Sequence, residues 1–148
     1  MPLAVVMEDP ERYDLKTCHT GYVMIQRMTF GEKLERRKFN SKMELQMQRG
    51  SREAKSTIDM FNEAMEIYDF QHCIVEHNLT KWVNSQGAPC KRDDPDGREV
   101  PLDFMKIIDI KMLPAQIAEE IGTAIDKLNN FEESDEVGNS SGASVRTS

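Results

Sequence analysis

The apolar residues between Ser51 and Asn78 form the clearest pattern in this chain. Five of them recur at steps of four, three, four and three residues, which places them on one face of a helix, while charged residues fill the other faces. The five are Ala54, Ile58, Phe61, Met65 and Tyr68. This spacing predicts an amphipathic helix over about 51–68, with Ser51 as its N-cap. The β-branched and aromatic run at 70–77 fits a strand or the last turns of that helix, and we favour a strand.

Residues 20–28, upstream of this helix, predict a second strand. Val23 and Ile25 lie on one face of it, and Tyr22 and Met24 lie on the other. Because both faces carry large apolar side chains, we expect a sheet that is partly covered on both sides.

A capping box follows directly after this strand. Thr29 and Glu32 have the spacing of this motif. In it the Thr hydroxyl accepts from the backbone N–H three residues later, and the Glu side chain at that position accepts from the backbone N–H of the Thr. The motif predicts a helix from about residue 30 to about residue 38. Apolar and polar residues then alternate over 39–49, where a strand competes with a continued helix.

The second half of the chain predicts a polar connection followed by two helices. The sequence from Asp94 to Gly97 is a strong turn signal, and it makes 79–100 a loop or hairpin tip. A short helix is expected to begin near Asp103. A longer one is expected over 114–129, with a proline at its first position and two asparagines to close it. Its apolar face consists of Ile117, Ile121, Ala124, Ile125 and Leu128.

Together these elements predict a mostly helical α+β domain over 20–130. Strands near 20–28 and 70–77 would form a small sheet or hairpin, packed by amphipathic helices at about 30–38, 51–68 and 114–129. Residues 1–19 show no sustained period and are expected to be an N-terminal arm. Residues 131–148 are acidic and then rich in Gly and Ser, with almost nothing to bury, so we expect a disordered tail.

Charge and cysteine content narrow the functional classes. The 148 residues carry a net charge of −7, which makes nucleic acid an unlikely partner, although 33–55 holds eight Lys or Arg against three Glu. Three cysteines without a CxxC spacing favour a reducing cytoplasm. No apolar run approaches the roughly 18–20 residues that cross a bilayer, and the first residues lack a basic leader. We therefore expect a soluble intracellular protein that does not enter a membrane.

Candidate chemical sites are few in this sequence. His72, Cys73 and His77 cluster along the chain, but they match no established zinc spacing. The acidic turn at 93–97 has part of the composition of a calcium loop, but Pro95 and the absence of a closing Glu defeat the match. The chain contains no Ser/His/Asp order, phosphate loop or nucleophile elbow. We predict that the protein is not an enzyme and uses no cofactor and no metal.

Four stretches together resemble the tail assembly chaperones of long-tailed phages and prophages. They are Gly21–Leu34, Phe70–Leu79, Pro101–Phe104 and Leu113–Asn130, and the resemblance covers about 21–133. It implies a non-enzymatic assembly factor in the cytoplasm of the bacterial host. Such a chaperone holds the tape-measure protein in solution while the tail tube polymerises, and it is absent from the mature virion. Members of the family are often also made as a longer frameshifted product.

Two other functions stay open at this point. One is a structural virion component, such as a connector or tail-completion protein, and the other is a nucleic-acid-binding regulator that uses the basic 33–55 segment. The tail tube protein and a second copy of this chain are further candidate partners. For a helical partner we predict a groove lined by Phe30, Leu34, Ile117, Ile121, Ile125 and Leu128, with a role for all six in the core as the alternative.

Overall fold

Helices and antiparallel strands alternate along the computed structural model of this chain, which describes residues 4–48 and 54–131. The fold is α+β, with four helices and two small sheets in the described residues. The elements are β1 (Glu11–Asp14), β2 (Tyr22–Ile25), α1 (Phe30–Gln48), α2 (Ala54–Cys73), β3 (Ile74–His77), β4 (Thr80–Val83), β5 (Arg98–Pro101), α3 (Ile107–Lys111) and α4 (Ala115–Asn129).

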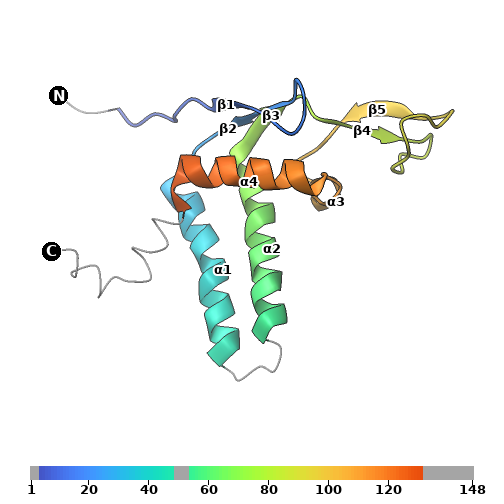
Figure 1. Cartoon of the computed structure of the whole chain (residues 1–148). Coiled ribbons are helices and arrows are strands. Elements are labelled where there is room, and N and C mark those ends of the chain that lie inside the picture. The colour runs from blue at the N-terminus through green and yellow to red at the C-terminus, as the bar shows by residue number, and fades with distance from the viewer. Residues whose placement is uncertain (1–3, 49–53, 132–148) are drawn as a thin grey trace.

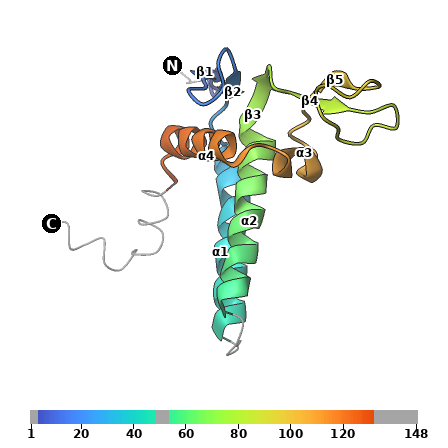
Figure 2. The ribbon, with the colours of Figure 1, turned by 45° about the vertical axis from the view of Figure 1, so that its right-hand side comes forward.

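The helix α4 is the centre of the arrangement. It crosses the upper ends of α1 and α2, which run side by side as an antiparallel hairpin and extend away from the rest of the molecule (Figure 1). The sheet β1-β2-β3 lies on the other side of α4, and the β4–β5 hairpin extends to one side (Figure 2). The core lies where β2, α4 and the end of α2 meet. Its most buried apolar side chains are Val23, Cys73, Ile121 and Ile125.

The predicted strand at 20–28 is present as the shorter β2, which is the central strand of its sheet. Val23 lies opposite Tyr13 of β1 and His77 of β3. Val23 and Ile25 are buried on the face toward α4. The N-terminal arm expected at 1–19 is wrong for Glu11–Asp14, because these residues pair with β2 along their whole length.

The capping box at Thr29 is confirmed and begins α1. The Thr29 N–H donates to the Glu32 carboxylate at 2.9 Å, and the Glu32 N–H donates to Oγ1 of Thr29 at 3.2 Å. The helix continues to Gln48, so a strand within 39–48 is excluded. Phe39 explains the continuation, because its ring packs edge-on against Tyr68 of α2 at 5.8 Å and thus ties the middle of α1 to its neighbour.

The predicted central helix is present as α2, but it ends later than expected. A strand from residue 70 is wrong for 70–73, which form the last turn of α2, and β3 covers only Ile74–His77. Phe70 and Cys73 are three residues apart and both are buried, which fits one helical face against the core. The proposed N-cap Ser51 and the side chains of Ala54 and Ile58 lie outside the part that the structure describes.

The polar connection at 79–100 contains a β-hairpin, as one of the two alternatives predicted. Trp82 of β4 lies opposite Glu99 of β5, and the Gly97 N–H donates to the Asp94 carbonyl at 3.0 Å in the expected turn. The short helix expected near Asp103 begins four residues later, at Ile107. Before it, the Asp103 carboxylate accepts from the Met105 N–H and holds a turn.

The last helix agrees with its prediction within one residue. It begins at Ala115, with Pro114 at the N-cap, and ends at Asn129. The C-cap Asn130 has the left-handed conformation that often closes a helix. Buried Asn129 joins this end to the sheet, because its side-chain oxygen accepts from the Met28 N–H at 2.8 Å. Phe131, expected to open the tail, is buried. Residues 132–148 lie outside the described part.

Candidate functional site

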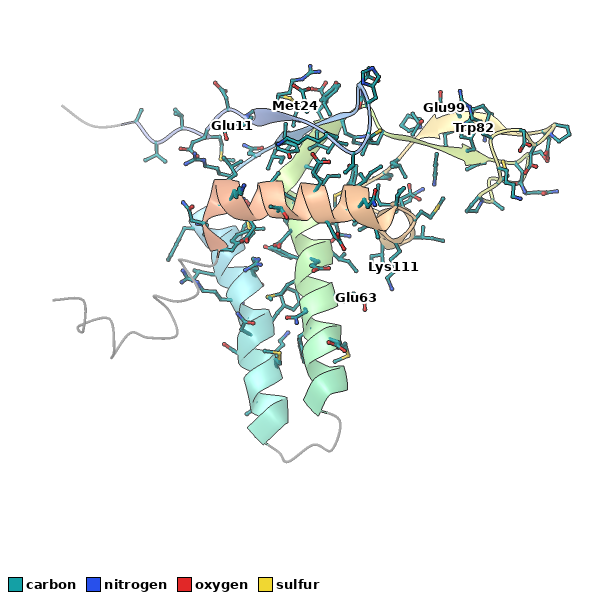
Figure 3. The ribbon with its side chains drawn as sticks, in the orientation of Figure 1. Glu11, Met24, Glu63, Trp82, Glu99 and Lys111 are labelled. Carbon is teal, nitrogen blue, oxygen red and sulfur yellow. The ribbon has the colours of Figure 1, made fainter. Side chains whose placement is uncertain are left out.

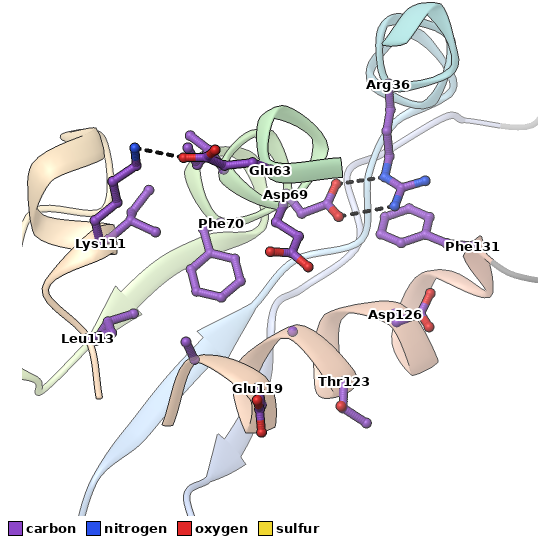
Figure 4. A pocket seen from close by; sticks show the side chains of 15 residues that line it. Arg36, Glu63, Asp69, Phe70, Lys111, Leu113, Glu119, Thr123, Asp126 and Phe131 are labelled. Atoms are coloured by element: carbon purple, nitrogen blue, oxygen red, sulfur yellow. Dashed lines mark hydrogen bonds and ion pairs between the residues drawn. The ribbon is translucent and has the colours of Figure 1, made fainter. Parts of the chain in front are cut away.

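A groove of about 580 Å³ lies between α2, α3 and α4 (Figure 4). Phe70 lies within it, together with half-buried apolar residues from all three helices. The apolar members of the lining are Ile67, Phe70, Ile110, Leu113, Ala118, Gly122 and Phe131. A concave surface of this size and composition is typical of a site that receives apolar groups of another molecule.

Arg36 and Asp69 form an ion pair in the wall of this groove. Nε and one terminal nitrogen of Arg36 donate to the two carboxylate oxygens of Asp69 at 2.7 and 3.2 Å (Figure 4). The guanidinium also lies 3.7 Å above the centre of the Phe131 ring. Burial raises the pKa of Asp69 to about 6, against the opposing effect of Arg36. Arg36 thus connects α1, α2 and Phe131, which follows the C-cap of α4, around one end of the groove.

Glu63 and Lys111 form a second ion pair at the opposite rim. They face each other from α2 and α3 at 2.7 Å, and both side chains are more than half exposed (Figure 3). An exposed pair of this kind contributes less than about 1 kcal/mol to stability. It can therefore rearrange when another charged group reaches the groove.

Three further carboxylates line the groove without a charged or hydrogen-bonding side-chain partner among the described residues. They belong to Glu66 of α2 and to Glu119 and Asp126 of α4. Glu66 and Asp126 add to the negative potential at Asp69 and help to raise its pKa. The lining therefore combines an apolar floor with more acidic than basic side chains.

Glu120 holds α4 in place from its opposite face. Its two carboxylate oxygens accept from Oη of Tyr13, the backbone N–H groups of Lys16 and Thr17, and Oγ1 of Thr17, at 2.6–3.0 Å. Burial alone would raise the pKa of Glu120, but the four donors outweigh it and lower this pKa to about 2. Glu119, which lines the groove, and Glu120 therefore point to different faces of α4.

Asp109 positions α3 at the other rim. It is buried and accepts from Nζ of Lys81 at 2.6 Å and from the Asp103 N–H at 2.9 Å. Burial opposes ionisation of Asp109, but these two donors outweigh it and lower the pKa of Asp109. The ion pair connects α3 to β4, so the β-hairpin and the groove rim are fixed to each other.

The six residues predicted to line one groove are divided among different places. Ile121 and Ile125 are buried in the core, because the apolar face of α4 packs on β2, and they are not accessible to a partner. Ile117 is partly buried against the same core, and Leu128 lines a smaller hollow of about 260 Å³ beside β1. Phe30 and Leu34 are exposed on α1, with 72% and 41% of their surface accessible. The alternative that all six are core is thus wrong as well.

The remaining sequence candidates have ordinary structural roles. His72 stacks on Tyr68 with ring centres 3.9 Å apart, and Cys73 is buried. His77 packs edge-on against Phe104, and burial lowers the pKa of His77. Within residues 4–48 and 54–131, no group of three or more His, Cys, Asp or Glu residues could hold a metal ion together.

The basic cluster Arg36-Arg37-Lys38 is largely engaged within the molecule. Arg36 contacts Asp69 and Phe131, and Lys38 donates to Glu35 at 2.8 Å. Two of its three cations therefore already have acidic partners. This leaves the nucleic-acid alternative with less free positive charge than the sequence suggested.

Sequence reasoning did not find the groove, although one signal for it was present. Asp69 lies four residues after Met65 and so falls on the apolar face of the central helix. A carboxylate on a buried face requires a cationic partner. The partner, Arg36, is 33 residues away in sequence, and only the packing of α1 on α2 identifies it.

Comparison with known proteins adds no relative. No family model matches the chain, and no curated protein or solved structure matches it either. In the described part of the chain, every helix is too short or too polar to cross a membrane.

Proposed function

We propose that this protein is a non-enzymatic assembly chaperone of a long-tailed phage or prophage, which binds the tape-measure protein and keeps it in solution in the bacterial cytoplasm. The proposal combines the resemblance of the sequence to this family with one structural observation. That observation is the open groove between α2, α3 and α4, where an apolar floor is accessible beside carboxylates that have no cationic partner within residues 4–48 and 54–131.

A chaperone that keeps a partner in solution needs a surface that covers the partner's apolar side chains until assembly buries them. The groove offers side chains from three helices, and its volume of about 580 Å³ accepts several apolar side chains from one face of a helix. The carboxylate of Asp69 in the lining has a raised pKa, but both its oxygens already accept from Arg36. This carboxylate is therefore occupied by a structural contact, which favours binding over acid–base catalysis.

Co-expression provides the direct test. The full chain is produced together with a fragment of the tape-measure protein from the same genome, and the soluble fraction of the fragment is compared with that from the fragment expressed alone. A chaperone raises this fraction and co-purifies with the fragment. An unchanged fraction without co-purification would refute the proposed function.

Purified particles distinguish the chaperone from the structural virion component. Mass spectrometry of mature virions should find no stoichiometric amount of the chain if it acts only during assembly. Recovery at a fixed ratio to the tail tube protein would favour a connector or tail-completion protein instead.

A further inference from the structure

We infer that the groove binds a cationic amphipathic helix, with apolar side chains on the floor and Lys or Arg side chains at the rim. This inference rests on the proposed function and specifies the chemistry of the partner segment. Three carboxylates, of Glu66, Glu119 and Asp126, lie on two sides of the apolar floor without a cationic partner among the described residues.

The surface around the groove supports an occupant larger than a small molecule. Met105, Ile107 and Ile108 lie at and just before α3, whose next residues line the groove, and 50–65% of their surface is accessible. Several exposed apolar side chains close together in the chain are typical of a surface that binds another protein segment. A helix is about 10–12 Å wide with its side chains, so one face enters the groove while the flanks reach the rim.

Charge decides between the candidate occupants. Residues 132–148 of this chain carry four acids and one arginine, so they have the same sign as the groove rim. A second copy has a basic stretch in α1, but Arg36 there is already engaged, and copies with a net charge of −7 repel each other. A cationic segment of a different protein is the occupant that neutralises the rim.

Two labelled peptides of identical apolar pattern test the charge class. One carries Lys at its polar helix positions and the other carries Glu, and fluorescence anisotropy measures the affinity of each for the full-length protein. We expect at least tenfold tighter binding of the Lys peptide, with an affinity that falls as salt concentration rises. Equal affinities, or tighter binding of the Glu peptide, would overturn the inference.

A triple variant removes the rim charge. In Glu66→Gln/Glu119→Gln/Asp126→Asn we expect about a tenfold loss of affinity for the Lys peptide, because each of three exposed ion pairs contributes a factor of about two. The matched control removes three exposed acids elsewhere and should change the affinity less than twofold. It is Glu11→Gln/Glu76→Gln/Asp93→Asn. Equal losses in the two triple variants would show that only net charge matters and would contradict a site at the groove.

Gly122 tests the apolar floor without any change of charge. A Cβ added here meets only Cε1 of Phe70, at 3.8 Å, so Gly122→Ala fits, whereas the longer side chain of Gly122→Leu occupies the groove. We expect Gly122→Leu to weaken binding of the Lys peptide at least tenfold and Gly122→Ala to change it less than twofold. Circular dichroism at 222 nm verifies that both variants are folded. A folded Gly122→Leu variant that binds normally would overturn the inference.

The same variants separate this inference from the proposed function. If the rim-neutralised protein keeps the tape-measure fragment soluble as well as the original does, the groove inference fails and the chaperone function stands. If the original protein does not keep the fragment soluble, the proposed function fails, and the peptide measurements still decide the groove. Concentration-dependent self-association that the rim variant abolishes, without competition from the Lys peptide, would assign the groove to a second copy and overturn the inference.

Discussion

Replacing Glu120 by Gln should loosen the attachment of α4 to the segment after β1. The carboxylate accepts four hydrogen bonds, from Tyr13, from the Lys16 N–H, and from the N–H and hydroxyl of Thr17. Gln keeps one acceptor oxygen, loses the negative charge and places an amide N–H₂ against donors. The edge strand β1 and the core-packed helix α4 are joined here, so the loss should affect global stability.

The magnitude follows from the number and type of these bonds. A hydrogen bond to a charged group contributes roughly 1.5–3 kcal/mol. The four bonds share one partly exposed carboxylate and are not additive, so we expect a loss on the order of 2–3 kcal/mol at pH 7. For a domain of this size, that loss lowers Tm by about 5–10 °C.

The dependence on pH gives the sign of the effect. The pKa of Glu120 in the folded protein is about 2, below its ordinary value of 4.5. Its contribution is therefore complete above about pH 4.5 and is lost as the pH falls toward 2. The difference in unfolding free energy between the original protein and Glu120→Gln should shrink over this window.

Urea denaturation followed by circular dichroism at 222 nm measures this difference, with Glu119→Gln as the matched control. Glu119 is the neighbouring acid on the groove side, and its replacement should cost less than about 0.5 kcal/mol. A second readout is Tyr13, whose pKa is raised by its hydrogen bond to Glu120 and should return toward 10 in the variant. An equal loss in the two variants, or a Glu120→Gln difference that persists undiminished at pH 2.5, would refute the reasoning.

Three further changes test the supports of the groove. Lys81→Met leaves the Asp109 carboxylate buried without its cation and should cost about 3–5 kcal/mol in urea denaturation, and Asp109→Asn in the same chain should recover part of it. Gly122→Ala should stabilise α4 by up to about 1 kcal/mol in the same assay, because the new Cβ meets only Phe70. Burial raises the pKa of Asp69 to about 6 in the folded protein, so the folded protein keeps this proton up to a higher pH than the unfolded chain does. The free energy of unfolding should therefore fall as the pH rises from about 4 to 6. In Asp69→Asn this fall in the free energy of unfolding should disappear, and an unchanged or steeper fall would contradict the raised pKa of Asp69.

Local pattern was sufficient for the elements whose signals lie within a few residues. The capping box of Thr29 and Glu32 located the start of α1 because both partners of the motif are three residues apart. The apolar spacing of α4 located that helix within one residue, and the alternation around Val23 identified β2. Each of these signals depends on contacts within one element or on one buried face, and such contacts are visible in the order of the residues.

The end of α2 and the place of the N-terminal segment depended on partners elsewhere in the chain. Phe70 and Cys73 have strand-compatible neighbours, and they became helical because the last turn of α2 packs into the core beside α4. Residues 11–14 show no period of their own, and they form β1 because β2 offers a free edge and Glu120 holds the following segment.

The sequence by itself determined which faces are apolar, where α1 and α4 begin and that the protein is acidic. Only the tertiary structure decided what packs against those faces. Ile121 and Ile125, predicted to contact a partner, are buried against the sheet, and the groove opens on another side of the same helix. The physical reason is that the spacing of apolar residues shows which face of a helix is hydrophobic but not which element packs against that face. Arg36 and Asp69 show the same limit, since an ion pair across 33 residues is fixed by packing and not by spacing.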